Sequence, residues 1–268
     1  MEISVAKGNV MEKAVELSAD QELHITIEEG AQLQLLLAGS CGHVTTEVYV
    51  GKGATLDLCD LDQNLANTTR IHNLHIRQDA DSNAFVQSIS LGAGNTRNTT
   101  QVDLCGEGAT LSLNGIVIAN HSQHIDNHTL VQHLVPHGTS NQLFKYILDD
   151  QAVGTYAGLV KVAPGAHHTH SEQTNRNLCV TREARMFAQP QLEIYNDDVR
   201  CNHGATVGQL DETALFYMQQ RGIPKHEARL LLMHAFVGEV IDQVRIPTLR
   251  ERLHLLVEQR FQELGAKS

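Results

Sequence analysis

The pattern of apolar and polar positions divides this chain into a long strand-like body and a shorter helical tail. In the body, apolar and polar residues alternate, as at 55–58 and 110–113. Alternation with a period of two predicts β-strands that bury one face. A glycine-containing turn precedes such runs at 29–33, 52–56 and 107–111. The body is therefore predicted to consist of repeated units, each a turn followed by a strand.

The spacing of these turns is typical of a solenoid. Weaker copies begin at Asp79 and Pro136, so that successive copies lie 23 to 29 residues apart. Two or three short strands in a repeat of this length form one coil, which buries its inward side chains against the next coil. We predict a mainly β fold, a β-solenoid, over residues 1–208. A β-sandwich with regular hairpins is the alternative, because a glycine before each strand suits a hairpin equally well.

The character of the sequence changes near residue 209. Asp211 is a suitable N-cap, and Gly222 ends the helical run that follows. Two more amphipathic helices are expected, beginning near Pro224 and at Pro247. We predict a helical module at residues 209–268. It is expected to cover the end of the solenoid, either as a cap alone or as a cap that also docks a partner protein.

Composition and charge narrow the function classes. The net charge of -11 disfavours binding to nucleic acid, because phosphate backbones are also negative. The five cysteines form no CxxC pair, which indicates free thiols in a reducing compartment. The sequence shows neither a secretory leader nor an apolar run of membrane-spanning length. We therefore expect a cytoplasmic protein that binds neither nucleic acid nor membranes.

Histidine and cysteine provide the candidate chemistry. Cys201 and His203 would share one face of a strand, about 7 Å apart, and both side chains can hold iron. His168 and His170 would also share a face if the segment that contains them is a strand. The bland alternative is a buried cysteine and ordinary solvated histidines.

Catalytic signatures are missing from the sequence, which contains no GxSxG, P-loop, GxGxxG or HExxH motif. We expect a protein that is not an enzyme. One alternative is a metal-dependent, histidine-ligated enzyme on a β-solenoid. Another is a carbohydrate-active β-helix, which the scarcity of stacking aromatic residues disfavours.

One long run carries a family resemblance. Residues 189–208 read QPQLEIYNDDVRCNHGATVG, and residues 214–224 read ALFYMQQRGIP. This composite, ungapped run resembles the C-terminal signature of the SufB/SufD family of iron–sulfur cluster assembly proteins. The resemblance is strong over roughly the last 80 residues, and looser in the repetitive body.

The resemblance implies a right-handed parallel β-helix at 1–208, followed by an ATPase-docking helical module at 209–268. It implies a non-catalytic scaffold subunit of a SUF-type assembly complex. Its partners would be SufC, an ABC-type ATPase that binds the ATP, and a second SufB/SufD-type subunit. An iron–sulfur cluster would form transiently, shared with that second subunit.

The resemblance also assigns roles to individual residues. His203 matches the family histidine at the subunit interface where the cluster is expected to assemble, as either an iron ligand or a proton handler. Cys201 is the second candidate ligand there. Cys179, His168 and His170 are weaker metal candidates. The segment expected to dock the ATPase contains Asp211, Leu215, Phe216, Tyr217, Arg221 and Gly222.

Three departures from the family pattern refine these expectations. Ala184 stands close to the position of a SufB-type cysteine, and Asn202-His203-Gly204 replaces a SufB-type Glu-His-Glu. Both differences favour SufD. The large helical domain that typically begins a SufD chain is not visible in this sequence, which leaves open a naturally short subunit or a truncated one. Either a homodimer or a SufB–SufD heterodimer is compatible with the sequence.

Overall fold

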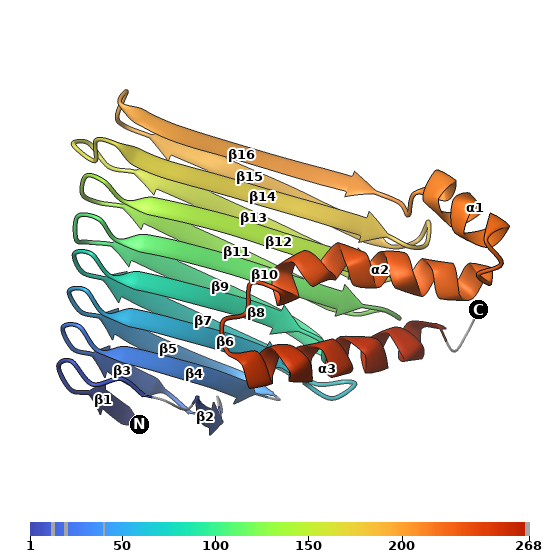
Figure 1. Ribbon diagram of the computed structural model, residues 1–268, viewed down its shortest axis with the longest axis horizontal. Helices are drawn as coiled ribbons and strands as arrows, with labels where there is room; N and C mark the ends of the chain where they lie inside the picture. Colours follow the sequence, from blue (N-terminus) through green and yellow to red (C-terminus); the bar gives the residue numbers. More distant parts are fainter. Residues whose placement is uncertain (12–13, 19–20, 40, 266–268) are drawn as a thin grey trace.

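The strands of the protein stack into two parallel sheets that face each other (Figure 1). A computed structural model describes residues 1–11, 14–18, 21–39 and 41–265. The strands are β1 (Glu2–Val5), β2 (Val15–Ser18), β3 (Leu23–Ile27), β4 (Gln32–Gly39), β5 (Gly42–Val50), β6 (Thr55–Asp62), β7 (Thr69–Gln78), β8 (Asn83–Ser90), β9 (Asn95–Leu104), β10 (Thr110–Ala119), β11 (His124–His133), β12 (Thr139–Leu148), β13 (Val153–Val162), β14 (Thr169–Cys179), β15 (Arg185–Ile194) and β16 (Val199–Gly208).

Odd-numbered strands form one eight-stranded sheet and even-numbered strands form the other. Each coil therefore contains two strands, and each strand pairs in parallel with the equivalent strand of the next coil. This arrangement confirms the predicted β-solenoid. The β-sandwich alternative is wrong, because hairpins would pair consecutive strands in antiparallel orientation.

The repeated turns observed in the sequence occupy one edge of the solenoid. Gly53, Asp81, Gly108 and His137 take the same place in successive turns, and their φ angles lie between 56° and 73°. The left-handed conformation lets the Gly53 amide donate to the Ala80 carbonyl of the next coil, at 2.9 Å. Asp81 and His137 hold this place in the weaker copies. The left-handed conformation is more strained for them than for glycine, which has no Cβ.

Three helices follow the last strand: α1 (Glu212–Gln220), α2 (Lys225–Ile241) and α3 (Pro247–Gly265). The Asp211 carboxylate caps α1 by accepting hydrogen bonds from the backbone amides of Thr213 and Ala214. Gly222, with φ at 84°, follows the C-cap of the same helix. None of the helices in the described ranges is both long and apolar enough to cross a bilayer.

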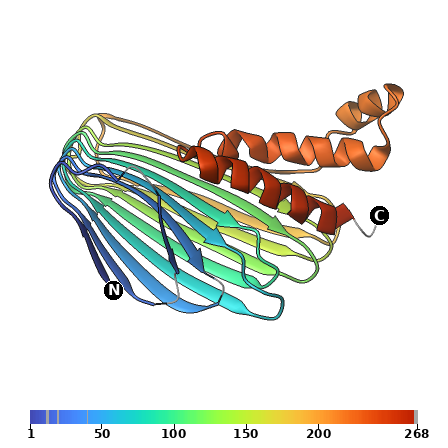
Figure 2. The ribbon, with the colours of Figure 1, turned by 60° about the horizontal axis from the view of Figure 1, so that its bottom comes forward.

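The tail covers a face of the solenoid. Figure 2 shows α2 and α3 lying across the even-numbered sheet. Their apolar residues, such as Val237 and Leu253, share a buried cluster with Leu61 and Ile118 on the outward side of the strands. The interpretation that the helices cap the solenoid end is therefore wrong. The helices remove the outward-facing aliphatic side chains of the sheet from water, which is favourable.

Two buried cations fasten the helices to the sheet. The Lys145 ammonium on β12 donates to the Phe236 carbonyl of α2, at 2.6 Å, and pairs with Glu239. Arg260 of α3 donates to Asn120 Oδ1, at 2.8 Å, and to Gln123 Oε1, at 2.6 Å, in the turn before β11. These directional contacts fix the position of the tail on the sheet.

Candidate functional site

The last coil of the solenoid, β15 and β16, leaves its end open. Among the described residues each of these strands pairs with one neighbour only, and the helices lie over the sheet instead of this end (Figure 1). Apolar side chains at the open end, including Ile194 and Val207, are 40% and 54% exposed. An unpaired strand edge beside exposed apolar groups is typical of a protein–protein interaction surface.

Cys201 and His203 come together at this open end. On β16, Cys201 pairs with Ser171 and His203 pairs with Gln173 of β14. Ser171 and Gln173 are buried inside the solenoid, so their in-register partners also point inward, at the uncovered end. Cys201 is partly buried against the core, whereas His203 is exposed.

A change in the interior distinguishes the coils beneath these two residues. In the earlier coils the positions stacked below Cys201 are Ala84 and Leu111, and those below His203 are Val86 and Leu113. In the last two coils before the open end they become polar. Ser140 and Ser171 lie below Cys201, and Gln142 and Gln173 lie below His203.

The serines belong to a buried hydrogen-bonded chain. His133 Nε2 lies 2.8 Å from Ser140 Oγ, and Ser140 Oγ lies 2.9 Å from Ser171 Oγ. Burial raises the pKa of the Cys201 thiol, and a hydrogen bond with the Ser171 backbone opposes that rise. A metal ion or a nearby cation would therefore be needed to convert this thiol to a thiolate ligand.

Burial of His133 makes the stability of the solenoid dependent on pH. Burial lowers the pKa of His133 from 6.5 to about 4, so the imidazole is neutral in the folded protein. As the pH falls, the imidazole of the unfolded chain binds a proton at a higher pH than the imidazole of the folded protein. The free energy of unfolding therefore decreases between pH 6.5 and about pH 4. We expect the free energy of unfolding to fall by about 2 kcal/mol from about pH 7.5 to about pH 5, in urea titrations. His133→Leu, which matches Leu104 of the preceding coil, should flatten this part of the curve. An equal slope in the variant would contradict the assignment.

The weaker metal candidates do not join this pair. His168 lies in the turn before β14 with φ at 57°, stacks on His137 at a ring-centroid distance of 4.9 Å and approaches Asp198 within 3.1 Å. The expectation that His168 and His170 share a strand face is therefore wrong. His170 is exposed, and its register partner is Arg200. Cys179 ends β14, about 26 Å along the strand from Ser171 at 3.3 Å per residue. In the described residues no group of three or more metal-binding side chains converges.

The residues expected to dock a partner separate into two kinds. Asp211 caps α1, Leu215 is buried, and Gly222 provides the left-handed residue after the helix. Phe216 and Tyr217 are instead 62% and 60% exposed on a helix that packs on α2. The Arg221 guanidinium lies over the Tyr217 ring at 5.2 Å and donates to its hydroxyl at 3.0 Å. Two large aromatic side chains are thus presented to solvent.

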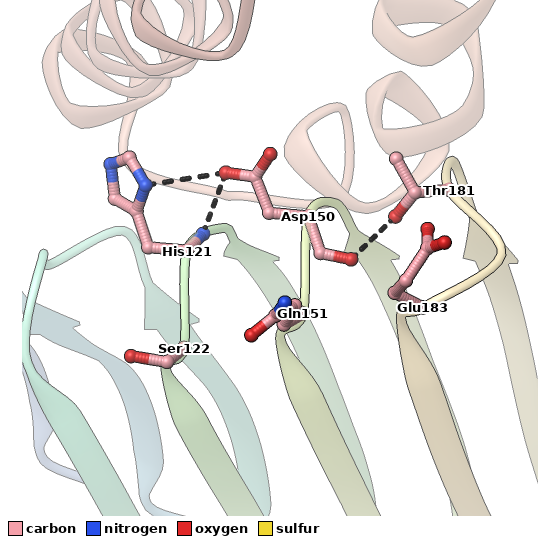
Figure 3. Close-up of a pocket in the computed structure, with 6 residues that line it drawn as sticks. All are labelled: His121, Ser122, Asp150, Gln151, Thr181 and Glu183. Atoms are coloured by element: carbon pink, nitrogen blue, oxygen red, sulfur yellow. Dashed lines mark hydrogen bonds and ion pairs between the residues drawn. The ribbon is translucent and has the colours of Figure 1, made fainter.

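A polar hollow of about 590 Å³ lies on the edge of the solenoid formed by the turns after the even-numbered strands (Figure 3). His121 Nδ1 lies 3.2 Å from Asp150 Oδ2, and the Thr181 hydroxyl donates to the Asp150 carbonyl at 2.7 Å. Ser122, Gln151 and Glu183 complete its lining. The candidate metal-binding and docking residues named from the sequence do not line this hollow.

Fold and surface together define a β-solenoid with its last coil open and with a projecting helix. The family model for the SufBD core domain of SUF-system iron–sulfur cluster assembly matches residues 9–236. The chain belongs to this family.

Curated relatives agree with this assignment. An iron–sulfur cluster assembly SufBD family protein of Synechocystis is 33% identical over 81% of this chain and 48% of its own length. The iron–sulfur cluster assembly protein SufD of Escherichia coli is 36% identical over 68% of this chain and 43% of its own length. A SufBD family protein of Mycobacterium tuberculosis is 32% identical over 90% of this chain and 63% of its own. The chain thus spans about half the length of these relatives.

Proposed function

We propose that this chain is a non-catalytic scaffold subunit of a SUF-type assembly complex, working in the cytoplasm with a second SufB/SufD-type subunit and a SufC-type ABC ATPase. A nascent iron–sulfur cluster is the cargo, held for a time between two subunits. The observation that carries this proposal is the convergence of Cys201 and His203 at the open end of a solenoid.

An incomplete donor set supports the sharing of the cluster. Cluster irons are held by thiolate or imidazole ligands, commonly four in all. This end of the chain offers one thiol and one imidazole on a single strand. A second subunit could cover the exposed apolar residues and pair with the unpaired edges of β15 and β16. It would also bring the remaining iron ligands. The same contact would remove the unpaired strand edges from solvent.

The identity of the missing donor supports a SufD-like role. Ala184 stands close to the place where the resemblance puts a SufB-type cysteine, and it is 8% exposed in the turn before β15. A methyl group there cannot bind sulfur or iron. Any thiol beyond Cys201 would therefore come from the partner subunit, whether that partner is a SufB-type chain or a second copy that uses its own Cys201.

The projecting helix α1 is the proposed ATPase contact. Phe216 and Tyr217 are exposed on it, and aromatic residues are enriched among the residues that dominate binding energy. α1 packs on α2, and α2 is fastened to the sheet by Lys145. A movement of the ATPase would thus reach the solenoid through packed helices.

The test of the proposed site is His203→Ala in the complete complex. Loss of a ligand is expected to lower the initial rate of cluster formation by about 10-fold or more, since even outer partners of ligands have effects of that size. The exposed position of His203 predicts little change in the urea midpoint. The rate is followed by visible absorption after anaerobic addition of iron and sulfide.

His124→Ala is the matched control, because His124 is also exposed on a strand but lies away from the open end, on β11. Its rate should equal that of the unmodified chain. A wild-type rate in His203→Ala would remove His203 from the site. The mass of the complex would separate a homodimer from a heterodimer.

A further inference from the structure

Gln173 is a fully buried amide without a hydrogen-bond partner, directly beneath His203. Its exposed fraction is 0%, and neither Nε2 nor Oε1 meets the geometry of a hydrogen bond. In-register pairing places the two Cα atoms one strand spacing apart, about 4.8 Å. Buried polar side chains normally form hydrogen bonds, so an unpaired amide at this position indicates a function other than packing.

The surroundings of Gln173 leave one polar atom available. Gly158 lacks a side chain where a Cβ would lie 2.3 Å from Gln173 Nε2 and 2.7 Å from the Tyr156 hydroxyl. The amide nitrogen and this hydroxyl therefore share the space above Gly158. Burial raises the pKa of Tyr156, and the nearby Gln173 amide opposes that rise, although the contact does not meet the geometry of a hydrogen bond. The side-chain oxygen is left for a neighbour on β16.

We propose that Gln173 is a positioning residue for His203. Its side-chain oxygen, which has no partner in this structure, would accept the N–H of the imidazole when the ring turns toward it. This contact would fix the ring orientation and the tautomer, so that the other ring nitrogen faces the open end. A histidine that binds metal almost always donates its second N–H to such an acceptor. This inference rests on the proposed function, because His203 is the ligand that the Gln173 amide would orient.

A purely structural role does not account for an amide at this position. The stack beneath His203 contains Gln142 and then Leu113, Val86 and Leu58, so aliphatic side chains fit the same place in other coils. An unpaired buried amide lowers stability relative to an apolar group of similar shape. Removal of the amide should therefore leave the fold intact or strengthen it.

The experiment compares three variants of the full chain labelled with nitrogen-15 histidine. Gln173→Met keeps the length of the side chain but removes the acceptor, and Gln173→Glu keeps an acceptor oxygen. Gln142→Met makes the same change one coil farther from His203. The His203 signals are assigned by their loss in His203→Ala. The measurement is the ratio of its two neutral tautomers from nitrogen chemical shifts.

We expect Gln173→Met to shift the tautomer ratio of His203 about 3- to 10-fold, the effect of losing one hydrogen bond. Gln173→Glu and Gln142→Met should keep the ratio of the unmodified chain. An unchanged ratio in Gln173→Met overturns the proposal, as does an equal shift in Gln142→Met or in Gln173→Glu. The urea midpoint of Gln173→Met should be unchanged or higher.

Cluster formation in the complete complex provides a second readout. Gln173→Met is expected to slow it by about 10- to 100-fold, the usual effect of losing an outer partner of a ligand. A normal rate would overturn the proposed role. The two proposals can be refuted independently. A wild-type rate of cluster formation in His203→Ala refutes the proposed site. The tautomer ratio tests the role of Gln173 even if His203 proves not to be a ligand.

Discussion

Replacing Arg70 with methionine is expected to lower the free energy of unfolding by about 3–5 kcal/mol, because the change leaves a buried carboxylate without its counterion. Arg70 Nη2 lies 2.5 Å from Asp60 Oδ1 inside the solenoid, and the two side chains are 3% and 5% exposed. His72 Nδ1 lies 2.9 Å from the other carboxylate oxygen. Burial alone would raise the pKa of Asp60, but Arg70 and His72 together hold it well below its usual range.

Urea unfolding at neutral pH measures this effect. Arg252→Met is the matched control, since Arg252 forms an exposed pair with Glu16 at 3.4 Å, and it should change stability by less than about 1 kcal/mol. Asp60→Asn combined with Arg70→Met should recover part of the loss, because no buried charge remains at the Asp60 position. A loss below about 1 kcal/mol in Arg70→Met would refute the dependence on the pair.

The pH dependence of the same variant gives a second check. In the unmodified chain the lowered pKa of Asp60 supplies stability above its ordinary value of 3.8, and this stability is lost as the pH falls. Without Arg70, the pKa of the buried carboxyl is raised, so protonation stabilises the folded state. The difference in the free energy of unfolding between the unmodified chain and Arg70→Met should therefore shrink as the pH is lowered toward 3.8.

Replacing Phe216 and Tyr217 together with alanine is expected to weaken the complex with the proposed ABC-type ATPase partner by about 100-fold or more. Both side chains are largely exposed on α1, so the change removes aromatic contact area without opening the core. The circular dichroism and the urea midpoint should be those of the unmodified chain. The affinity is measured by calorimetry with the purified ATPase subunit.

Leu255→Ala on α3 is the control, because Leu255 is similarly exposed, at 61%, but lies on another helix. It should change the affinity less than about 3-fold, as most exposed contacts do. An unaltered affinity in the double variant would show that α1 is not the docking helix. The proposed route from ATPase to solenoid would then need another contact.

The strands, their turns and the helical tail could be predicted from the sequence, because these depend on local patterns. Period-two alternation and recurring turns located the coils, and Asp211 and Gly222 marked the ends of α1. The tail position on the even-numbered sheet could not be predicted in the same way. It depends on outward-facing aliphatic residues such as Leu61 and Ile118, which gather only when the coils stack.

The candidate site could be predicted only in part. Residues two apart on a strand share a face, and so Cys201 and His203 could be paired from their spacing. The position of His168 could not, because its left-handed backbone depends on the turn that joins two coils. Ser171 and Gln173 were missed for another reason. They lie 30 residues before Cys201 and His203, and only an alignment of the later coils at that spacing would have found them.

The sequence by itself determined a β-solenoid with a helical tail, the alternation that points Cys201 and His203 to one side, and the family signature at 189–224. The tertiary structure alone decided that strands pair across coils, that the helices cover a face and leave the last coil open, and that a buried amide lies beneath His203. The division has one physical reason. Backbone preference and side-chain alternation are local, whereas burial depends on which distant residues stack together.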